Sequence, residues 1–184
     1  MKRYLGSTYL FGLIGGVFCV LAFLLFKWIG FDATNLSMLC GYVLIPIFVF
    51  LGIRYFRNDI NGGELSFAHG MTIGFLIYTM IGLVAGLGIW LILSLSPGFF
   101  EEIKAAKVAV METNEELIVG QLGQESFDFT YEKIQAMTAL DIAMNDFIWK
   151  ILPGLFFTII ISIILRRTNP MRIRVDFFII CRML

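Results

Sequence analysis

Residues 67–95 read FAHGMTIGFLIYTMIGLVAGLGIWLILSL and contain no Asp, Glu, Lys or Arg. A helix needs about 20 mostly apolar residues to cross the hydrocarbon core of a bilayer, so this stretch is long enough to span it. The strand-like alternation of apolar and polar residues that is typical of membrane barrels is absent. The sequence therefore predicts a membrane-spanning helix from about Phe67 to Leu95.

Three more apolar stretches of spanning length occur, at about residues 10–29, 36–53 and 147–165. The chain of 184 residues is 59% hydrophobic and 15% charged, against about 45–50% and about 25% in soluble domains. A soluble globule would leave much of this apolar surface in water, and a disordered chain needs low hydrophobicity. We therefore predict an all-α integral membrane protein, with four transmembrane helices in one domain over residues 1–168.

The positions of the basic residues predict how this bundle is oriented. All the arginines fall on the side that carries both termini and the loop between spans two and three, and the other side carries only lysines. This distribution is the positive-inside pattern, so we expect both termini, the loop and the tail of residues 169–184 in the cytoplasm. Trp28, Trp90 and Trp149 fall toward the outer ends of their spans, where amphipathic rings suit the headgroup layer.

A long segment, residues 96–146, separates spans three and four and is predicted to be an extracytoplasmic helical insertion. Pro97 suits the first turn of a helix, and Gly120 to Gly123 indicates a break. Apolar residues then recur at helical spacing on each side of this break. The first stripe is Phe99, Ile103, Ala106, Val110 and Leu117, and the second is Ile134, Met137, Leu140, Met144 and Ile148. We expect the second helix to begin near Thr130, with the option that it continues unbroken into span four.

Two interpretations of the outer helices stay open. They form a small cap over the bundle, or they rest on the outer leaflet or bind a partner. Surface-active helices usually carry Lys-rich and Arg-rich polar faces, whereas the polar faces here are rich in Glu. This difference favours the cap.

The charged residues next to the spans are interpreted as solvated. Lys27 and Lys150 lie near span ends, from which a long side chain reaches the interface. The Glu115–Glu116 pair and the run from Asp141 to Asp146 are interpreted as solvated helix faces. We therefore expect no ionisable group deep inside the bundle, where coupled transporters typically carry one.

No constellation of reactive side chains is recognisable. His69 is the only histidine, and we interpret it as an interfacial residue that hydrogen-bonds a loop, with Glu64 nearby. A metal site needs three or four ligands at suitable spacing, and Cys19, Cys40 and Cys181 form no cluster. No nucleophile elbow, zinc-protease motif or phosphate-binding loop occurs. We predict no catalytic, metal-binding or cofactor-binding residue and no cofactor.

Glycines form one packing motif. Gly70, Gly74, Gly82 and Gly86 recur at steps of four and eight residues along span three, which gives a face of small residues that a second helix can approach closely. Gly12 and Gly16 in span one form a similar pair and are candidates for the facing helix. The alternative is a groove for lipid or another subunit.

Three functional hypotheses follow. The favoured one is a non-enzymatic membrane protein that assembles with itself or with an envelope protein through the glycine face and the outer helices. The alternative is a subunit of a transporter or channel for a small solute or a lipid, lined by Thr72, Thr79, Thr158 and Ser162. A lipid enzyme that uses His69 with Glu64 is the third. The net charge of zero points to no nucleic acid.

The order of these features resembles a bacterial membrane family known as domain of unknown function 4199. The resemblance covers about residues 5–168, and the tail from Met171 onward departs from it. It implies an inner-membrane location and no assigned activity. It is carried by the order and spacing of short motifs, which are Tyr55, Arg57, Gly63, Ser66, Phe67, Gly70, Pro97-Gly98-Phe99, Arg166 and Arg167.

Overall fold

The computed structural model describes residues 2–167, so the predicted tail, Met171 and Cys181 lie outside the described residues. Within that range the chain is helical apart from its loops and one isolated bridge between Leu65 and Arg167. The predicted all-α class is therefore confirmed. In chain order the helices are α1 (Lys2–Ile29), α2 (Ala33–Tyr55), the π-helix η1 (Phe56–Ile60), α3 (Phe67–Leu95), α4 (Pro97–Thr113), α5 (Glu115–Leu122), α6 (Gln124–Gln135) and α7 (Ala139–Leu165).

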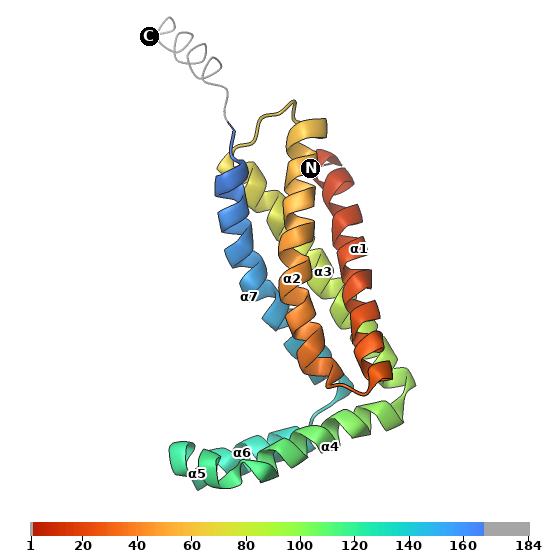
Figure 1. The fold of residues 1–184 in the computed structure, drawn as a ribbon, viewed down its shortest axis with the longest axis vertical. Helices are drawn as coiled ribbons and strands as arrows, with labels where there is room; N and C mark the ends of the chain where they lie inside the picture. Colours follow the sequence, from red (N-terminus) through yellow and green to blue (C-terminus); the bar gives the residue numbers. More distant parts are fainter. Residues whose placement is uncertain (1, 168–184) are drawn as a thin grey trace, which may run out of the picture.

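Four long helices, α1, α2, α3 and α7, run side by side and form an elongated bundle (Figure 1). Four segments are long and apolar enough to cross a membrane: Thr8–Ile29, Ala33–Ile60, Phe67–Leu95 and Ala139–Leu165. Large apolar side chains such as Leu87 and Phe156 are exposed on the outside of the bundle. This is the distribution expected where lipid, and not water, surrounds the helices.

Helix α3 lies at the centre of the packing, because it contacts α1, α2 and α7. Ile73, Ile77 and Ile81 are fully buried along one face of α3. Lipid tails are as apolar as these side chains, so close van der Waals packing, more than the hydrophobic effect, holds such helices together. The small residues of α3 matter for that reason.

Local sequence explains where the spanning helices begin. Asp32 caps α2 by accepting hydrogen bonds from the backbone N of Thr34 and Asn35. Ser66 caps α3 through the backbone N of His69. Thr138 begins α7 with a capping box that Asp141 completes. Each cap satisfies backbone donors that have no partner within their own helix.

The segment between α3 and α7 forms a helical arm, residues 97–135, which consists of α4, α5 and α6. The arm runs across the end of the bundle opposite the N-terminus and extends beyond the bundle to one side (Figure 1). Helix α6 packs against α4 and α5, and the Tyr131 hydroxyl donates to Glu112 Oε1 at 3.1 Å. The arm is therefore a folded unit that projects sideways from the bundle.

Three expectations about this segment need correction. The first stripe does not lie on one helix, because α4 ends at Thr113 and α5 begins at Glu115. The second helix begins at Gln124, not Thr130, directly after Gly123 with its φ of +84°. It does not continue into span four, since the capping box at Thr138 starts a new helix.

Only part of the arm acts as a cap. Phe99 and Ile103 of α4 are buried in a cluster with Phe23, Leu93 and other residues at the end of the bundle. Farther along the arm, large apolar side chains remain exposed, and these are Val110, Leu117, Leu122 and Phe129. The beginning of α4 thus covers the bundle end, and the rest of the arm offers apolar surface to its surroundings.

Candidate functional site: a buried ion pair and a glycine face

An ion pair lies inside the bundle where the sequence led us to expect none. Asp146 and Lys150 stand four residues apart on α7, and both oxygens of the Asp146 carboxylate accept from Lys150 Nζ. Lys150 is 0% exposed and Asp146 is 2% exposed. The interpretation of Lys150 as an interfacial residue and of Asp146 as part of a solvated face is therefore wrong.

Three helices enclose this pair. Lys150 packs against Gly41 of α2, where a Cβ atom would lie 2.8 Å from Lys150 Cε. Cys19 of α1 is buried and lies near both members of the pair. At 1.5 Å per residue, Lys150 lies roughly 16 Å along α7 from its start at Ala139. The pair therefore joins α7 to α1 and α2 within the apolar part of the bundle.

The sequence did contain a signal for this pair. Asp and Lys at positions i and i+4 share a helix face and can form an ion pair. Gly41 in the middle of a span is a second signal, because it leaves room for a long side chain from another helix. Neither is decisive alone, since the spacing also fits a solvated helix.

Several buried hydroxyl groups accompany the pair. Thr34 and Ser37 are buried on α2, seven and four residues before Gly41. Thr158 and Ser162 are fully buried on α7. None of these four hydroxyls has a hydrogen-bond partner within residues 2–167. Ser37, Thr158 and Ser162 lie farther from the helix ends than Thr34 and provide buried polar groups that the helix packing does not use.

The four hydroxyls predicted to line a transport path do not come together. Thr158 faces Gly74, and Ser162 faces Gly70. Thr72 is exposed and donates to the backbone oxygen of Ala68. Thr79 is half-buried and has no partner among the described residues. Only Thr158 and Ser162 therefore share one contact surface.

The glycine row of α3 faces α7 along its whole length. A Cβ at Gly70 would lie 2.6 Å from Ser162 Oγ, and one at Gly74 would collide with Thr158. Farther along, a Cβ at Gly82 would lie 2.9 Å from Phe147 Cδ2, and one at Gly86 would lie 3.4 Å from the Ala143 backbone oxygen. The row lets α3 and α7 approach closely, which is how small residues act in membrane helices.

Gly12 and Gly16 also lie against α3, but not against the glycine row. A Cβ at Gly12 would lie 2.6 Å from Met80 Cβ, and one at Gly16 would lie 2.5 Å from Val84 Cβ. The helix that faces the glycine row is therefore α7, and the two glycines of α1 pack against another face of α3. Hydrophobic periodicity cannot distinguish these partners, because both are apolar spans.

Near the arm, the glycine row opens into an apolar groove of about 440 Å³ between α3 and α7. Gly82 and Gly86 lie in the groove, which also contacts Trp90. The other lining residues are Leu83, Leu87, Leu140, Ala143, Met144 and Phe147. Leu87 is 63% exposed, so the groove opens toward the surroundings of the bundle.

The remaining candidates for chemistry stay separate. The His69 ring lies against Phe56, with 6.1 Å between the ring centroids. Across residues 2–167, no group of three or more His, Cys, Asp or Glu side chains is placed to hold a metal ion. Cys40 is partly buried and, like Cys19, is a free thiol. No arrangement of these residues points to a reaction.

Comparisons with known proteins give one family. A family model described as "Protein of unknown function (DUF4199)" matches residues 10–167. No curated protein and no solved structure matches the chain.

Proposed function

The family model covers most of the chain, so the protein belongs to the DUF4199 family, and we propose that it acts without catalysis, as a membrane protein that assembles with a second copy of itself. The observation that carries this proposal is the groove between α3 and α7. Its lining is apolar, and Leu83, Leu87 and Met144 expose large side chains there that a helix of another chain can cover. Homo-oligomers are the commonest assemblies of proteins, which favours a second copy as the occupant.

The proposed location is the bacterial inner membrane, with both termini in the cytoplasm and the arm outside. Arg57 donates through Nη1 to the Leu165 backbone oxygen at 3.5 Å, and Leu65 pairs with Arg167. These contacts gather Arg57 and Arg167 at the bundle end away from the arm. The arginine-rich end is the one that the positive-inside rule assigns to the cytoplasm.

Labelling of single cysteines in intact cells tests this orientation. In a variant without native cysteines, Glu125→Cys on the arm should react with a membrane-impermeant maleimide. Asn58→Cys, on η1 at the other end of the bundle, should react only after the cells are lysed. The opposite pattern would contradict the orientation.

Crosslinking in native membranes tests the assembly. Leu87→Cys places a thiol at the groove, and Leu51→Cys places one on an exposed part of α2, which is 42% exposed in the structure. Oxidation should produce a covalent dimer from Leu87→Cys and little from Leu51→Cys. A chain that stays monomeric in mild detergent and gives no dimer at either position would overturn the proposal, as would crosslinks only to a different protein.

Transport of a small solute is the second candidate, and the buried Asp146–Lys150 pair favours it. Ionisable side chains inside a membrane bundle are costly, and they mark ion pathways and proton relays in transporters. The unpartnered hydroxyls of Thr34 and Ser37 add polar groups on a neighbouring helix.

Flux into liposomes separates transport from assembly. A transporter should move a proton or small ion across the bilayer, and the double variant Asp146→Leu, Lys150→Met, which removes both charges together, should abolish that flux while the folded protein remains. Liposomes with the wild-type protein that stay as tight as empty ones would eliminate this candidate.

A further inference from the structure

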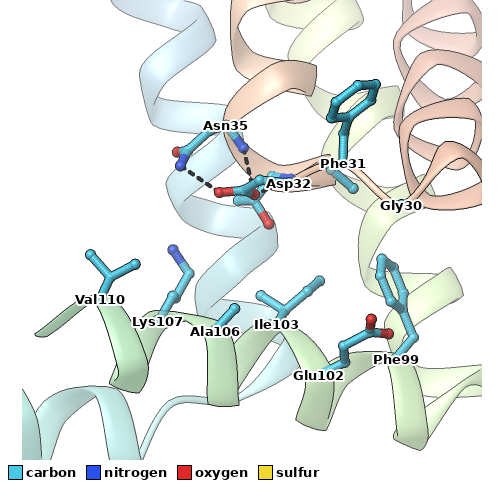
Figure 2. A pocket seen from close by; sticks show the side chains of 12 residues that line it. Gly30, Phe31, Asp32, Asn35, Phe99, Glu102, Ile103, Ala106, Lys107 and Val110 are labelled. Atoms are coloured by element: carbon cyan, nitrogen blue, oxygen red, sulfur yellow. Dashed lines mark hydrogen bonds between the residues drawn. The ribbon is translucent and has the colours of Figure 1, made fainter. Parts of the chain in front are cut away.

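A second hollow lies where the arm meets the bundle, on the side of α1 and α2. It has a volume of about 340 Å³ and lies between the loop that joins α1 to α2 and the helix α4 (Figure 2). Its lining combines charged and apolar residues, namely Gly30, Phe31, Asp32, Ala33, Thr34, Asn35, Phe99, Glu102, Ile103, Ala106, Lys107 and Val110. We refer to it as the arm pocket.

Charges of both signs face the arm pocket. The Asp32 carboxylate is held in place, since Oδ1 accepts from the backbone N of Thr34 and Asn35 and Oδ2 accepts from Asn35 Nδ2 at 2.7 Å. Lys107 extends from α4 toward that loop, and Glu102 stands one turn away on α4 (Figure 2). A ligand that carries one positive and one negative group would find a partner for each.

A buried hydroxyl adds a third polar group. Thr34 lines the arm pocket, is 5% exposed and has no hydrogen-bond partner for Oγ1 among residues 2–167. An unsatisfied buried hydroxyl costs free energy. A ligand atom in the pocket that accepts or donates a hydrogen bond would remove that cost.

The pocket lies at the depth of lipid headgroups. Its loop begins directly after α1 ends at Ile29 and leads into α2 at Ala33, so both spanning helices end at the pocket. Trp28 beside it is 88% exposed, as expected for an aromatic side chain in the interface. On α4, Ile103 and Val110 point toward the bundle side (Figure 2), where they can contact the apolar part of a lipid.

We propose that the arm pocket binds the headgroup of a phospholipid that carries a primary ammonium next to its phosphate. Lys107 and the Thr34 hydroxyl bind the phosphate oxygens, and Asp32 and Glu102 accept hydrogen bonds from the ammonium. A purely anionic headgroup is disfavoured, because two of the residues that line the pocket carry a carboxylate and one carries an ammonium group, and the ammonium of Lys27 nearby already lies over the Phe99 ring.

A quaternary ammonium headgroup fits less well. Such groups cannot donate hydrogen bonds and are recognised by the faces of aromatic rings. The ring of Phe99 is already occupied, since Lys27 Nζ lies 3.9 Å from its centroid. The Phe31 ring points away from α4 (Figure 2). The pocket therefore favours hydrogen-bonding ammonium over trimethylammonium.

Native mass spectrometry of the purified full-length protein tests the proposal. The protein in mild detergent is mixed with equal amounts of phosphatidylethanolamine, phosphatidylcholine and phosphatidylglycerol, and the retained lipid is identified. Phosphatidylethanolamine should be retained in preference. Lys107→Gln should weaken its retention roughly tenfold, because a charge-assisted hydrogen bond to phosphate is lost, and Thr34→Val should weaken it less.

Matched variants on α4 serve as controls. Lys104→Gln removes a lysine three residues from Lys107, and Glu101→Gln removes the carboxylate next to Glu102; both residues lie outside the lining of the arm pocket, and both variants should leave retention unchanged. Thermal unfolding followed by tryptophan fluorescence shows whether each variant is folded.

Two results would overturn the assignment. The pocket would not be a site for a zwitterionic headgroup if phosphatidylglycerol were retained equally well. The same would follow if the Lys107→Gln variant retained phosphatidylethanolamine like the wild type. Competition by free phosphoethanolamine as effective as that of the lipid would overturn the assignment to a lipid and indicate a soluble aminoalkyl phosphate as the ligand. The lipid site does not depend on whether the protein forms dimers.

Discussion

Replacement of Lys150 by methionine should destabilise the bundle strongly. The change removes both hydrogen bonds to the Asp146 carboxylate, which at 2% exposed is too deeply buried for bulk solvent to replace them. Removal of one partner of a buried ion pair costs about 3–5 kcal/mol, because the other charge stays buried without compensation. We expect a loss of that size in the free energy of unfolding for Lys150→Met.

The double variant Asp146→Leu, Lys150→Met should recover most of this loss. Apolar residues of similar volume in place of a buried ion pair are often neutral, or stabilising by about 1–4 kcal/mol. This result would mean that each charge of the pair mainly offsets the cost of burying the other, and that the pair as a whole adds little to the free energy of unfolding. An exposed lysine on the arm, Lys133, supplies the control, since Lys133→Met should change stability by less than about 0.5 kcal/mol.

Unfolding in mixed micelles of a mild detergent and SDS, followed by tryptophan fluorescence and circular dichroism, gives the four free energies. The reasoning is refuted if Lys150→Met is as stable as the wild type, because the lysine would then reach water. It is equally refuted if the double variant is as unstable as the single one, since the loss would then come from packing and not from an uncompensated charge.

Three further predictions concern α3, the arm and the start of α7. Gly74→Ala should lower the free energy of unfolding by about 1–3 kcal/mol, because the new methyl group collides with Thr158 of α7. Gly98→Ala has open space around it and should be tolerated. Unfolding in mixed micelles measures both variants. A spin label at Val110→Cys should be relaxed more strongly by oxygen dissolved in the bilayer than a label at Glu101→Cys, because Val110 points toward the bundle side of the arm. Equal oxygen accessibility of the two labels would argue against an arm that lies along the membrane. Thr138→Ala should cost about 0.5–2 kcal/mol by removal of the cap of α7, and hydrogen exchange should rise first in the adjacent turn.

The sequence predicts the spanning helices well, because the signal is strong and local. An apolar run such as residues 67–95 must form a helix in lipid, because its backbone N–H and C=O groups then find their hydrogen bonds within the segment. The cap at Ser66 and the turn at Gly62 and Gly63 also follow from local chemistry, since both glycines adopt positive φ. The family resemblance was confirmed over residues 10–167.

The ion pair could not be predicted in the same way. Its burial depends on two facts that are not local: α7 begins at Ala139, and its Lys150 face turns toward Gly41 of another helix. The arm also illustrates the limit, because the same apolar stripe fits one continuous helix or two. The capping box at Thr138 distinguishes them, and a Thr and an Asp three residues apart also occur where no helix begins.

The glycine row has a consequence for biogenesis. During synthesis α3 enters the bilayer before α7 exists, so the chain can first assemble α1, α2 and α3 only. The small-residue side of α3 must then stay without its final neighbour until the arm has been synthesised and the last helix has inserted. A nascent chain that stops before Ala139 would expose this side of α3 to other helices in the membrane. A chaperone or insertase would therefore have the largest exposed contact surface to cover during this interval.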